Sequence, residues 1–352
     1  MSTRLLKQST CQLNKTFAVF HQMFLADLPF STKCFYLKMP FPTKCFNNWK
    51  VRKTSKILIV CIFLLSLLEV ILRQCFGFCD ALLYQRSEEY EYIAQPNQER
   101  RRFGARIFYN SWSQRNEEPD TTKVRVLGLG DSVLFGGTWM DQDSLASTLF
   151  TLETGMQMLN ISCGSWGPDN CAAYIKKHGA FGAKAMVLVC SSHDARDVMS
   201  HEEVVGVMPN YPDGQYMSAI AELLGRYVVP RVWGVIGRTK DDPDAKVANS
   251  GYVRAKSDVF NPGFDKLKDI ADSLNIPFAI YLHAEQGELA KGEYNSMGKS
   301  IIAWAQENEV PLMQGLRNGE AETMYRDVIH LNEKGQRHLA DCLKRMTVRN
   351  FK

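Results

Sequence analysis

The sequence of 352 residues lacks several of the patterns that define common protein classes. It contains no Gly-x-x-x-x-Gly-Lys-Ser/Thr phosphate-binding loop, and Val133 stands where a dinucleotide motif starting at Gly128 would need its third glycine. Its ten cysteines are scattered, without the paired spacings of a zinc site. There is no internal repeat and no low-complexity tract. These absences argue against a nucleotide-dependent transferase and a zinc protein, and we expect neither a cofactor nor a metal ion.

Acidic residues are almost missing from the first 56 residues, which hold ten Lys/Arg and one acid, Asp27. The remaining residues hold 32 basic and 37 acidic side chains, so the overall charge of +4 combines a basic leader with a slightly acidic body. Because the basicity lies in the leader, the body is not a nucleic-acid binder by charge. We expect residues 1–56 to form a cytoplasmic leader, with Met39 as an alternative start.

Polar residues are scarce from Ile57 to Leu72, where only Ser66 and Glu69 interrupt an apolar stretch that could extend to Phe78. A spanning helix needs about 20 apolar residues, so this stretch is short. Mostly basic residues precede it and mostly acidic residues follow it, which places the N-terminus in the cytoplasm and the body outside. No small-x-small cleavage site follows it. We expect an uncleaved single-pass anchor over 57–78 in the cell inner membrane, with a periplasmic body; the alternative is a buried core helix.

The rest of the chain divides into a stalk, a domain and an insertion. Residues 79–120 are polar and aromatic and are expected to form the stalk. From residue 121 onward, strand-like runs alternate with helix-like segments, which indicates an α/β fold with a mainly parallel sheet covered by helices on both faces. We expect strands near 124–130, 156–161, 185–190, 277–282 and 310–313, and helices near 144–154, 170–178, 264–274, 297–308 and 333–346. Residues 195–262, with five prolines, break the alternation and are expected to form a lid or flap beside the site.

Two short motifs, far apart in the chain, carry the chemistry. Gly130-Asp131-Ser132 ends the first expected strand, where open α/β sheets keep their sites, and Asp327-Val-Ile-His330 precedes the last helix. A serine hydroxyl is protonated at neutral pH and needs a base, which an imidazole of ordinary pKa about 6.5 supplies. A carboxylate three residues earlier would hold the imidazole tautomer and stabilise the imidazolium. We therefore expect Ser132, His330 and Asp327 to form a catalytic triad.

These motifs resemble two of the four sequence blocks of the SGNH (GDSL-like) hydrolase family, over roughly residue 124 to the end. The family's second block, an asparagine followed five residues later by glycine, matches Asn160, with Ser165 at the glycine position. Its third block, Gly-x-Asn-Asp, matches Ser191-Ser-His-Asp194, with His193 in place of the asparagine. The resemblance implies a three-layer α/β/α, flavodoxin-like sandwich. It also implies an oxyanion hole made by the backbone N–H groups of Ser132 and Ser165 and the side chain of His193.

Side chains within these blocks are candidates for substrate contact, namely Asp131, Trp166 and Asp194. Trp166 is the best of the tryptophans for stacking on a sugar ring, although aromatic side chains are more often core residues. An exported domain would permit a disulfide, for which Cys163 and Cys171 are the best pair; free buried thiols are the alternative.

The leading hypothesis is a membrane-anchored serine esterase or O-acyltransferase, acting through an acyl-serine on acyl (acetyl) esters of a cell-envelope or exported polysaccharide. Acetyl and glycan are implied by how anchored members of the resembled family are used. Its partners would be the acylated carbohydrate, the membrane through one helix, and a membrane acyltransferase that hands over the acyl group, but no nucleic acid. The alternative is a catalytically weak module that binds glycan or scaffolds an envelope polysaccharide synthesis complex, motivated by the altered residues Ser165 and His193.

Overall fold

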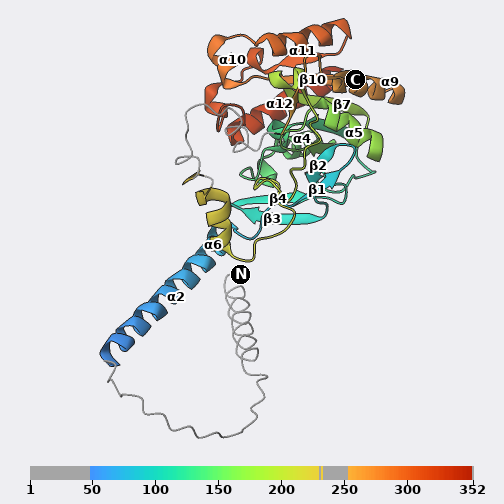
Figure 1. The fold of residues 1–352 in the computed structure, drawn as a ribbon. Helices are drawn as coiled ribbons and strands as arrows, with labels where there is room; N and C mark the ends of the chain where they lie inside the picture. The colour runs from blue at the N-terminus through green and yellow to red at the C-terminus, as the bar shows by residue number, and fades with distance from the viewer. Residues whose placement is uncertain (1–47, 230, 233–252, 351–352) are drawn as a thin grey trace. The chain divides into compact units, whose positions relative to one another are not determined.

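The computed structural model describes residues 48–229, 231–232 and 253–350 (Figure 1). The expected leader up to residue 47, the alternative start at Met39 and the middle of the expected insertion, 233–252, lie outside the described residues. The chain divides into two units, Met1–Leu58 and Ile59–Lys352. Of the first unit, the structure describes only the start of helix α2 (Asn48–Phe76).

A five-stranded sheet forms the centre of the second unit. Its strands follow the order β11-β10-β7-β5-β6, and every neighbouring pair is parallel. Strands β6, β7 and β10 are buried at every position, which explains the nearly continuous apolar sequence of β7 and β10. The predicted parallel α/β sheet is confirmed. The strands are β5 (Arg125–Gly130), β6 (Gln157–Ser162), β7 (Ala185–Ser191), β10 (Phe278–His283) and β11 (Leu312–Gln314).

Helices cover both faces of this sheet, because successive residues of each strand point to opposite sides. Val126 and Val187 face a cluster with helices α4 (Ala146–Thr154) and α12 (Glu333–Asn350). Their neighbours Leu127 and Leu188 face a second cluster, which contains residues of three helices. These helices are α5 (Pro168–His178), α9 (Gly263–Leu274) and α11 (Ser296–Glu307), and a shorter helix, α10 (Gln286–Lys291), follows β10. The arrangement is a three-layer α/β/α sandwich, as predicted.

The stalk prediction for residues 79–120 is wrong, because this segment folds onto the domain. It forms two antiparallel hairpins, β1 (Tyr84–Ser87) with β2 (Glu91–Ala94) and β3 (Gln98–Arg102) with β4 (Ala105–Tyr109). Between the polar residues lie aromatic and aliphatic side chains that are buried in the main core cluster. They include Tyr84, Tyr90, Tyr92, Ile93, Ile107 and Tyr109.

The expected insertion leaves and rejoins the domain at one place, where β8 (Asp197–Val198) pairs antiparallel with β9 (Ala255–Lys256). Between them, helix α6 (Ala219–Glu222) continues into a π-helical turn, η3 (Leu223–Val228). Its role as a lid stays a prediction. Cys163 and Cys171 are buried free thiols, so the structure contains no disulfide between them.

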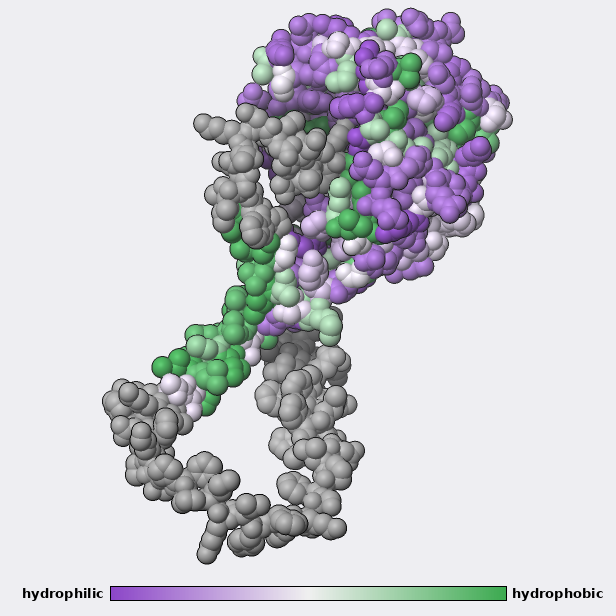
Figure 2. Space-filling model, viewed as in Figure 1, coloured by the Kyte–Doolittle hydropathy of each residue, from purple (hydrophilic) through white to green (hydrophobic). Residues whose placement is uncertain are grey.

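Helix α2 contains one stretch, Thr54–Phe76, that is long and apolar enough to cross a membrane. Its apolar side chains are exposed, for example Ile59 at 65% and Phe63 at 66%, and they give the helix an apolar surface (Figure 2). The alternative of a buried core helix is therefore wrong.

Candidate active site

The first three sequence blocks meet at the carboxyl edge of the sheet. Ser132 follows β5, Ser165 lies in the loop after β6, and His193 lies in the short 3-10 helix η2 (Ser192–Ala195) after β7. Because β5 lies between β6 and β7 with all three parallel, their carboxyl ends lie side by side. The topology thus brings together residues that are up to 61 positions apart in sequence.

Ser132 is the first residue of a four-residue helix, α3 (Ser132–Phe135). The side chain of Asp131 caps this helix by accepting a hydrogen bond from the N–H of Val133 at 2.8 Å. The two glycines before it, Gly128 and Gly130, lie within β5, which continues through Gly130. An added Cβ at Gly130 would lie 2.8 Å from the carbonyl oxygen of Val189, and one at Gly128 would lie 2.9 Å from Met158. These glycines therefore permit close packing of the strands beneath the serine.

The structure brings Ser132, His330 and Asp327 together as a hydrogen-bonded chain. The Nε2 atom of His330 lies 3.0 Å from the Oγ atom of Ser132. Its Nδ1 atom lies 2.9 Å from each of the two carboxylate oxygens of Asp327. The contact with Asp327 favours the imidazole tautomer that carries its proton on Nδ1. In this tautomer Nε2 is the nitrogen that can accept a proton from Ser132.

Asp327 is held as a carboxylate by its own loop. Burial raises the pKa of Asp327, but hydrogen bonds from the backbone N–H groups of His330 and Ile329, together with the His330 ring, outweigh burial and lower the pKa to about 2. These N–H groups donate to Oδ1 at 2.8 and 3.1 Å. The loop therefore fixes both the position and the negative charge of Asp327.

A buried ion pair that sequence reasoning missed supports this loop. His283, at the end of β10, contacts Glu320 through Nδ1 at 2.8 Å and the carbonyl oxygen of Ile329 through Nε2 at 2.7 Å. Burial lowers the pKa of His283, but Glu320 and the Ile329 carbonyl raise it above its ordinary value. The carboxylate of Glu320 also accepts hydrogen bonds from Tyr281 and Tyr325. An imidazolium that donates from both nitrogens thus ties the triad loop to the sheet.

A second missed residue, Arg115, holds the turn that follows the nucleophile. Its buried guanidinium donates hydrogen bonds to the carbonyl oxygens of Phe135, Gly137 and Met140, the last two at 2.6 and 2.7 Å. A charged residue in a polar stretch is usually solvated, so the sequence offered no signal for this role.

In the second block, the backbone conformation at Ser165 explains why the resembled pattern has a glycine at this position. Ser165 has a φ of 57°, in the left-handed region that glycine adopts without a steric penalty. The replacement keeps the loop path, so the backbone N–H of Ser165 stays a predicted oxyanion donor. Asn160 is buried in β6, where its side-chain amide donates to Ser147 at 2.8 Å and to the carbonyl of Leu134 at 3.2 Å.

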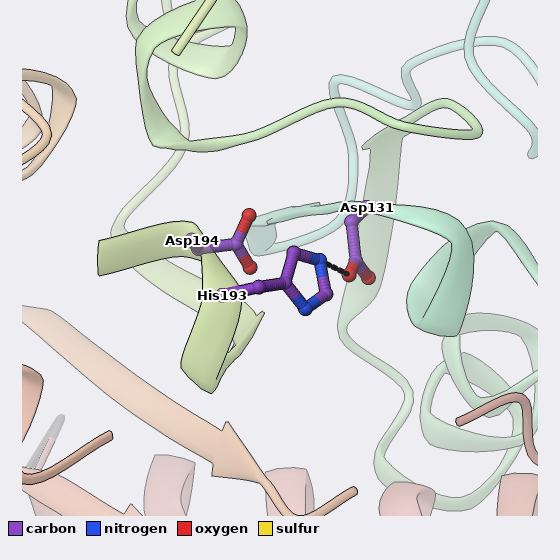
Figure 3. Close-up of side chains that lie close together, drawn as sticks. All are labelled: Asp131, His193 and Asp194. Atoms are coloured by element: carbon purple, nitrogen blue, oxygen red, sulfur yellow. Dashed lines mark ion pairs between the residues drawn. The ribbon is translucent and has the colours of Figure 1, made fainter. Parts of the chain in front are cut away.

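The third block places His193 among acidic side chains (Figure 3). Its Nδ1 lies 3.1 Å from Glu285 and its Nε2 lies 3.9 Å from Asp131, the residue before the nucleophile. Burial lowers the pKa of His193, but Asp194, Glu285 and Asp131 outweigh burial and raise it to about 9. Burial also raises the pKa of Asp194, to about 7. These acidic groups therefore favour the imidazolium form of His193 at neutral pH.

Asp131, His193 and Asp194 are also a group whose donor atoms, all within 4.8 Å of one another, could hold a metal ion. One carboxylate oxygen of Asp194, Oδ1, is buried without a hydrogen-bond partner. A metal ligand must be a neutral imidazole, whereas the acidic side chains around His193 favour its protonated form. The arrangement therefore favours an ion-paired imidazolium.

The residues expected to touch substrate lie inside the protein. Trp166 is 1% exposed, its Nε1–H donates to the carbonyl oxygen of Tyr92, and its ring packs against Tyr90, so it offers no face to a sugar. The expectation of sugar stacking by Trp166 is therefore wrong. Asp131 and Asp194 are 2% and 1% exposed and accept backbone hydrogen bonds, which makes them positioning residues.

Comparisons with known proteins give matches among solved structures alone. No family model matches the chain, and no curated protein matches it. A G-D-S-L lipolytic protein from Desulfitobacterium hafniense matches with a TM-score of 0.36 and 9% identity, over 63% of this chain and 99% of that protein. One from Veillonella parvula matches with a TM-score of 0.35 and 12% identity, over 64% and 99%. A carbohydrate acetylesterase from Sinorhizobium meliloti matches with a TM-score of 0.33 and 10% identity, over 64% and 99%.

At such identities and TM-scores a likeness does not establish an activity, so the chemistry of this chain is inferred from the geometry of its own residues. The three solved structures named above are two G-D-S-L lipolytic proteins and a carbohydrate acetylesterase.

Proposed function

We propose that this protein is a serine ester hydrolase or O-acyltransferase that works through an acyl-serine intermediate. The observation that carries the proposal is the chain of contacts from Ser132 through His330 to Asp327, with distances of 3.0 and 2.9 Å. Proton acceptors and a nucleophile at hydrogen-bond distance are what acyl transfer requires.

The proposed reaction has two halves. The Ser132 oxygen attacks the ester carbonyl while His330 Nε2 takes the serine proton, and His330 returns that proton to the departing alcohol as the C–O ester bond breaks. Water, or a sugar hydroxyl, then loses its proton to His330 and attacks the acyl-serine, and Ser132 leaves with a proton. Asp327 stabilises the imidazolium formed in both halves.

Stabilisation of the tetrahedral oxyanion is proposed to come from the N–H groups of Ser132 and Ser165 and from His193. Because His193 is an imidazolium, it would contribute a positive charge where the family pattern has a neutral amide. The ring faces Asp131 and Glu285 in this structure, so its use as a donor requires a small rotation toward the substrate.

The proposed substrate is an acyl ester, acetyl in particular, on a cell-envelope or exported polysaccharide. The proposed place of action is the periplasmic side of the inner membrane, with α2 as the anchor. The support is the exposed apolar helix Thr54–Phe76 and the basic-to-acidic charge change across it. A membrane acyltransferase that supplies the acyl group is part of the same proposal.

The test uses the full chain in detergent micelles. We expect hydrolysis of an aryl acetate and labelling of Ser132 by a fluorophosphonate, both lost in Ser132→Ala. Ser273→Ala, an exposed serine on α9, is the matched control and should behave as wild type. Equal rates in wild type and Ser132→Ala would contradict the enzyme and favour the glycan-binding module. Oligosaccharide acceptors that divert the acetyl group from water would identify a transferase.

A further inference from the structure

In helix α6 and the π-helical turn η3, charged side chains point into the protein and several apolar side chains are exposed. Glu222 is fully buried and the side chain of Arg226 is 11% exposed. Most of the large exposed side chains of this segment are apolar, namely Leu224 at 47%, Val228 at 38%, Val229 at 43% and, beyond η3, Val232 at 47%. Arg231 is exposed as well and donates a hydrogen bond to the carbonyl oxygen of Tyr227. A helix on a water-facing surface shows the reverse arrangement. The exposed face formed by Leu224, Val228, Val229 and Val232, here called the apolar face, therefore suits a surrounding other than water.

The inward orientation of Glu222 is fixed by strong contacts. Its carboxylate accepts hydrogen bonds from Arg102 and from the backbone N–H of Cys79, both at 2.6 Å. Arg102 also donates to the hydroxyl of Tyr227 at 2.9 Å. With these charges paired inside, the segment cannot rotate to hide Leu224 and Val228 without breaking a buried ion pair, which is costly.

The same segment is attached to the carboxyl-terminal part of helix α2. Glu69 accepts hydrogen bonds from the backbone N–H groups of Ala219 and Ile220 at 2.7 and 3.0 Å. Leu72 packs in one apolar cluster with Ala219, and Leu223 joins it. Glu69, which interrupts the apolar stretch of the proposed anchor, therefore caps the N-terminus of helix α6.

The contact between Glu69 and helix α6 determines how deep α6 lies relative to the proposed membrane-spanning stretch of α2. A hydrocarbon core about 30 Å thick corresponds to about 20 helical residues, which counted from Lys56 reach Phe76. Glu69 then lies roughly 10 Å inside the boundary on the side of the catalytic domain. Because α6 begins beside Glu69, its apolar face starts about 10 Å from that boundary, on the hydrocarbon side.

Aromatic side chains at the same place suit a membrane–water interface. Phe103, in the turn of the β3–β4 hairpin, packs with Tyr227 and stacks on Trp139 with ring centroids 4.0 Å apart. Trp139 remains 56% exposed. Amphipathic aromatic rings concentrate at the headgroup level of bilayers.

We propose that the apolar face is a second membrane contact, which inserts Leu224, Val228, Val229 and Val232 into the bilayer beside the anchor. The occupant is lipid, because the face is continuous with a helix of spanning length and is bordered by interfacial aromatics. The inference rests on the proposed anchor. Its consequence is that the catalytic domain is held against the membrane at a fixed orientation.

The test places the photo-crosslinker p-benzoylphenylalanine at position 224 or 228 of the full chain, in membranes of cells fed a clickable fatty acid. Position 64 in the anchor is the positive control, and position 259, a 70% exposed valine near β9, is the negative control. We expect lipid adducts at 64, 224 and 228 at about tenfold the level at 259. Fluorophosphonate labelling of Ser132 checks folding, and position 229 replaces any variant that fails it.

Adducts at 64 with none above the level of 259 at 224 and 228 would overturn the second contact and leave the anchor intact. Adducts at 224 or 228 to a protein rather than to lipid would overturn it as well and identify the face as a protein interface. Absence of lipid adducts at 64 would overturn the anchor and, with it, this inference.

Discussion

Ser165 and His193 are two of the residues at which this candidate site departs from the pattern it resembles, and each has a local physical consequence. Ser165 adopts a left-handed backbone, and His193 places an imidazolium among carboxylates. Both consequences are measurable at the level of single residues.

Ser165→Gly should stabilise the protein by roughly 0.5–1 kcal/mol, because glycine adopts a φ of 57° without the steric cost that serine carries. The substitution also removes a weak contact from the Tyr211 hydroxyl, at 3.5 Å. Denaturant unfolding measures the change. Ser273→Gly on the exposed side of α9 is the matched control and should destabilise the protein, since its backbone is helical. If Ser165→Gly lost as much stability as the control, the backbone of Ser165 would not be strained by its φ of 57°.

His193 should titrate near pH 9 in the folded protein. Its pKa is raised above the unfolded value of about 6.5, so its contribution to stability is complete below pH 6.5 and is lost as the pH rises through 9. NMR of labelled histidines should show an imidazole signal that titrates near pH 9 and is absent in His193→Asn. The exposed His201→Asn should keep that signal. If the signal lost in His193→Asn titrates near pH 6.5 instead, the imidazolium assignment is wrong.

At the scale of elements, the loop that carries Asp327 and His330 depends on contacts made by other elements. The Ile329 carbonyl accepts a hydrogen bond from His283 at the end of β10, and His283 is charged because Glu320 is beside it. A sequence motif supplies the triad residues, but these buried groups supply their position.

Glu320→Gln should destabilise the protein by about 3 kcal/mol, because it leaves the buried His283 imidazolium uncompensated. It should also lower kcat more than it raises KM, because the loop moves His330 away from Ser132. The double variant Glu320→Gln with His283→Gln should lose less stability than the sum of the two single variants. A double-mutant cycle from urea unfolding measures this, and additive losses would show that the pair is not coupled.

At the scale of the whole molecule, the domain begins earlier than the strand–helix alternation suggests. The two hairpins of residues 84–109 contribute buried tyrosines and isoleucines to the main core cluster, and Arg115 holds the turn after α3. These residues are part of the catalytic domain.

A chain that begins at residue 79 should fold cooperatively, whereas a chain that begins at residue 121 should not. The shorter chain loses several large buried side chains, and each such loss costs about 2–5 kcal/mol, which together exceeds the stability of a typical domain. Circular dichroism melting and fluorophosphonate labelling compare the two chains. Both chains begin after the apolar helix Thr54–Phe76, so the anchor is absent from both. Equal melting transitions would show that the hairpins are dispensable.

Much of this protein follows from its sequence, because the signals concerned are local. The apolar pattern of β5, β6, β7 and β10 indicates the strands, and the length of the apolar stretch identifies a candidate span. The motifs Gly130–Ser132 and Asp327–His330 predict the three side chains that form a hydrogen-bonded chain. Each is read from a few neighbouring residues, since strand burial, turn chemistry and helix length depend on nearest-neighbour spacing.

The tertiary structure decided the rest, because burial of a polar or aromatic residue depends on partners far away in the chain. Arg115 binds carbonyl groups 20 or more positions away, Glu69 caps a helix about 150 positions away, and Trp166 turns inward to bond Tyr92. From their sequence neighbours alone, Arg115 is expected to be a solvated cation, Glu69 a charge that interrupts a spanning helix, and Trp166 a residue that stacks on a sugar. Only the folded chain supplies the partners that offset their desolvation, and those partners determine where each side chain points.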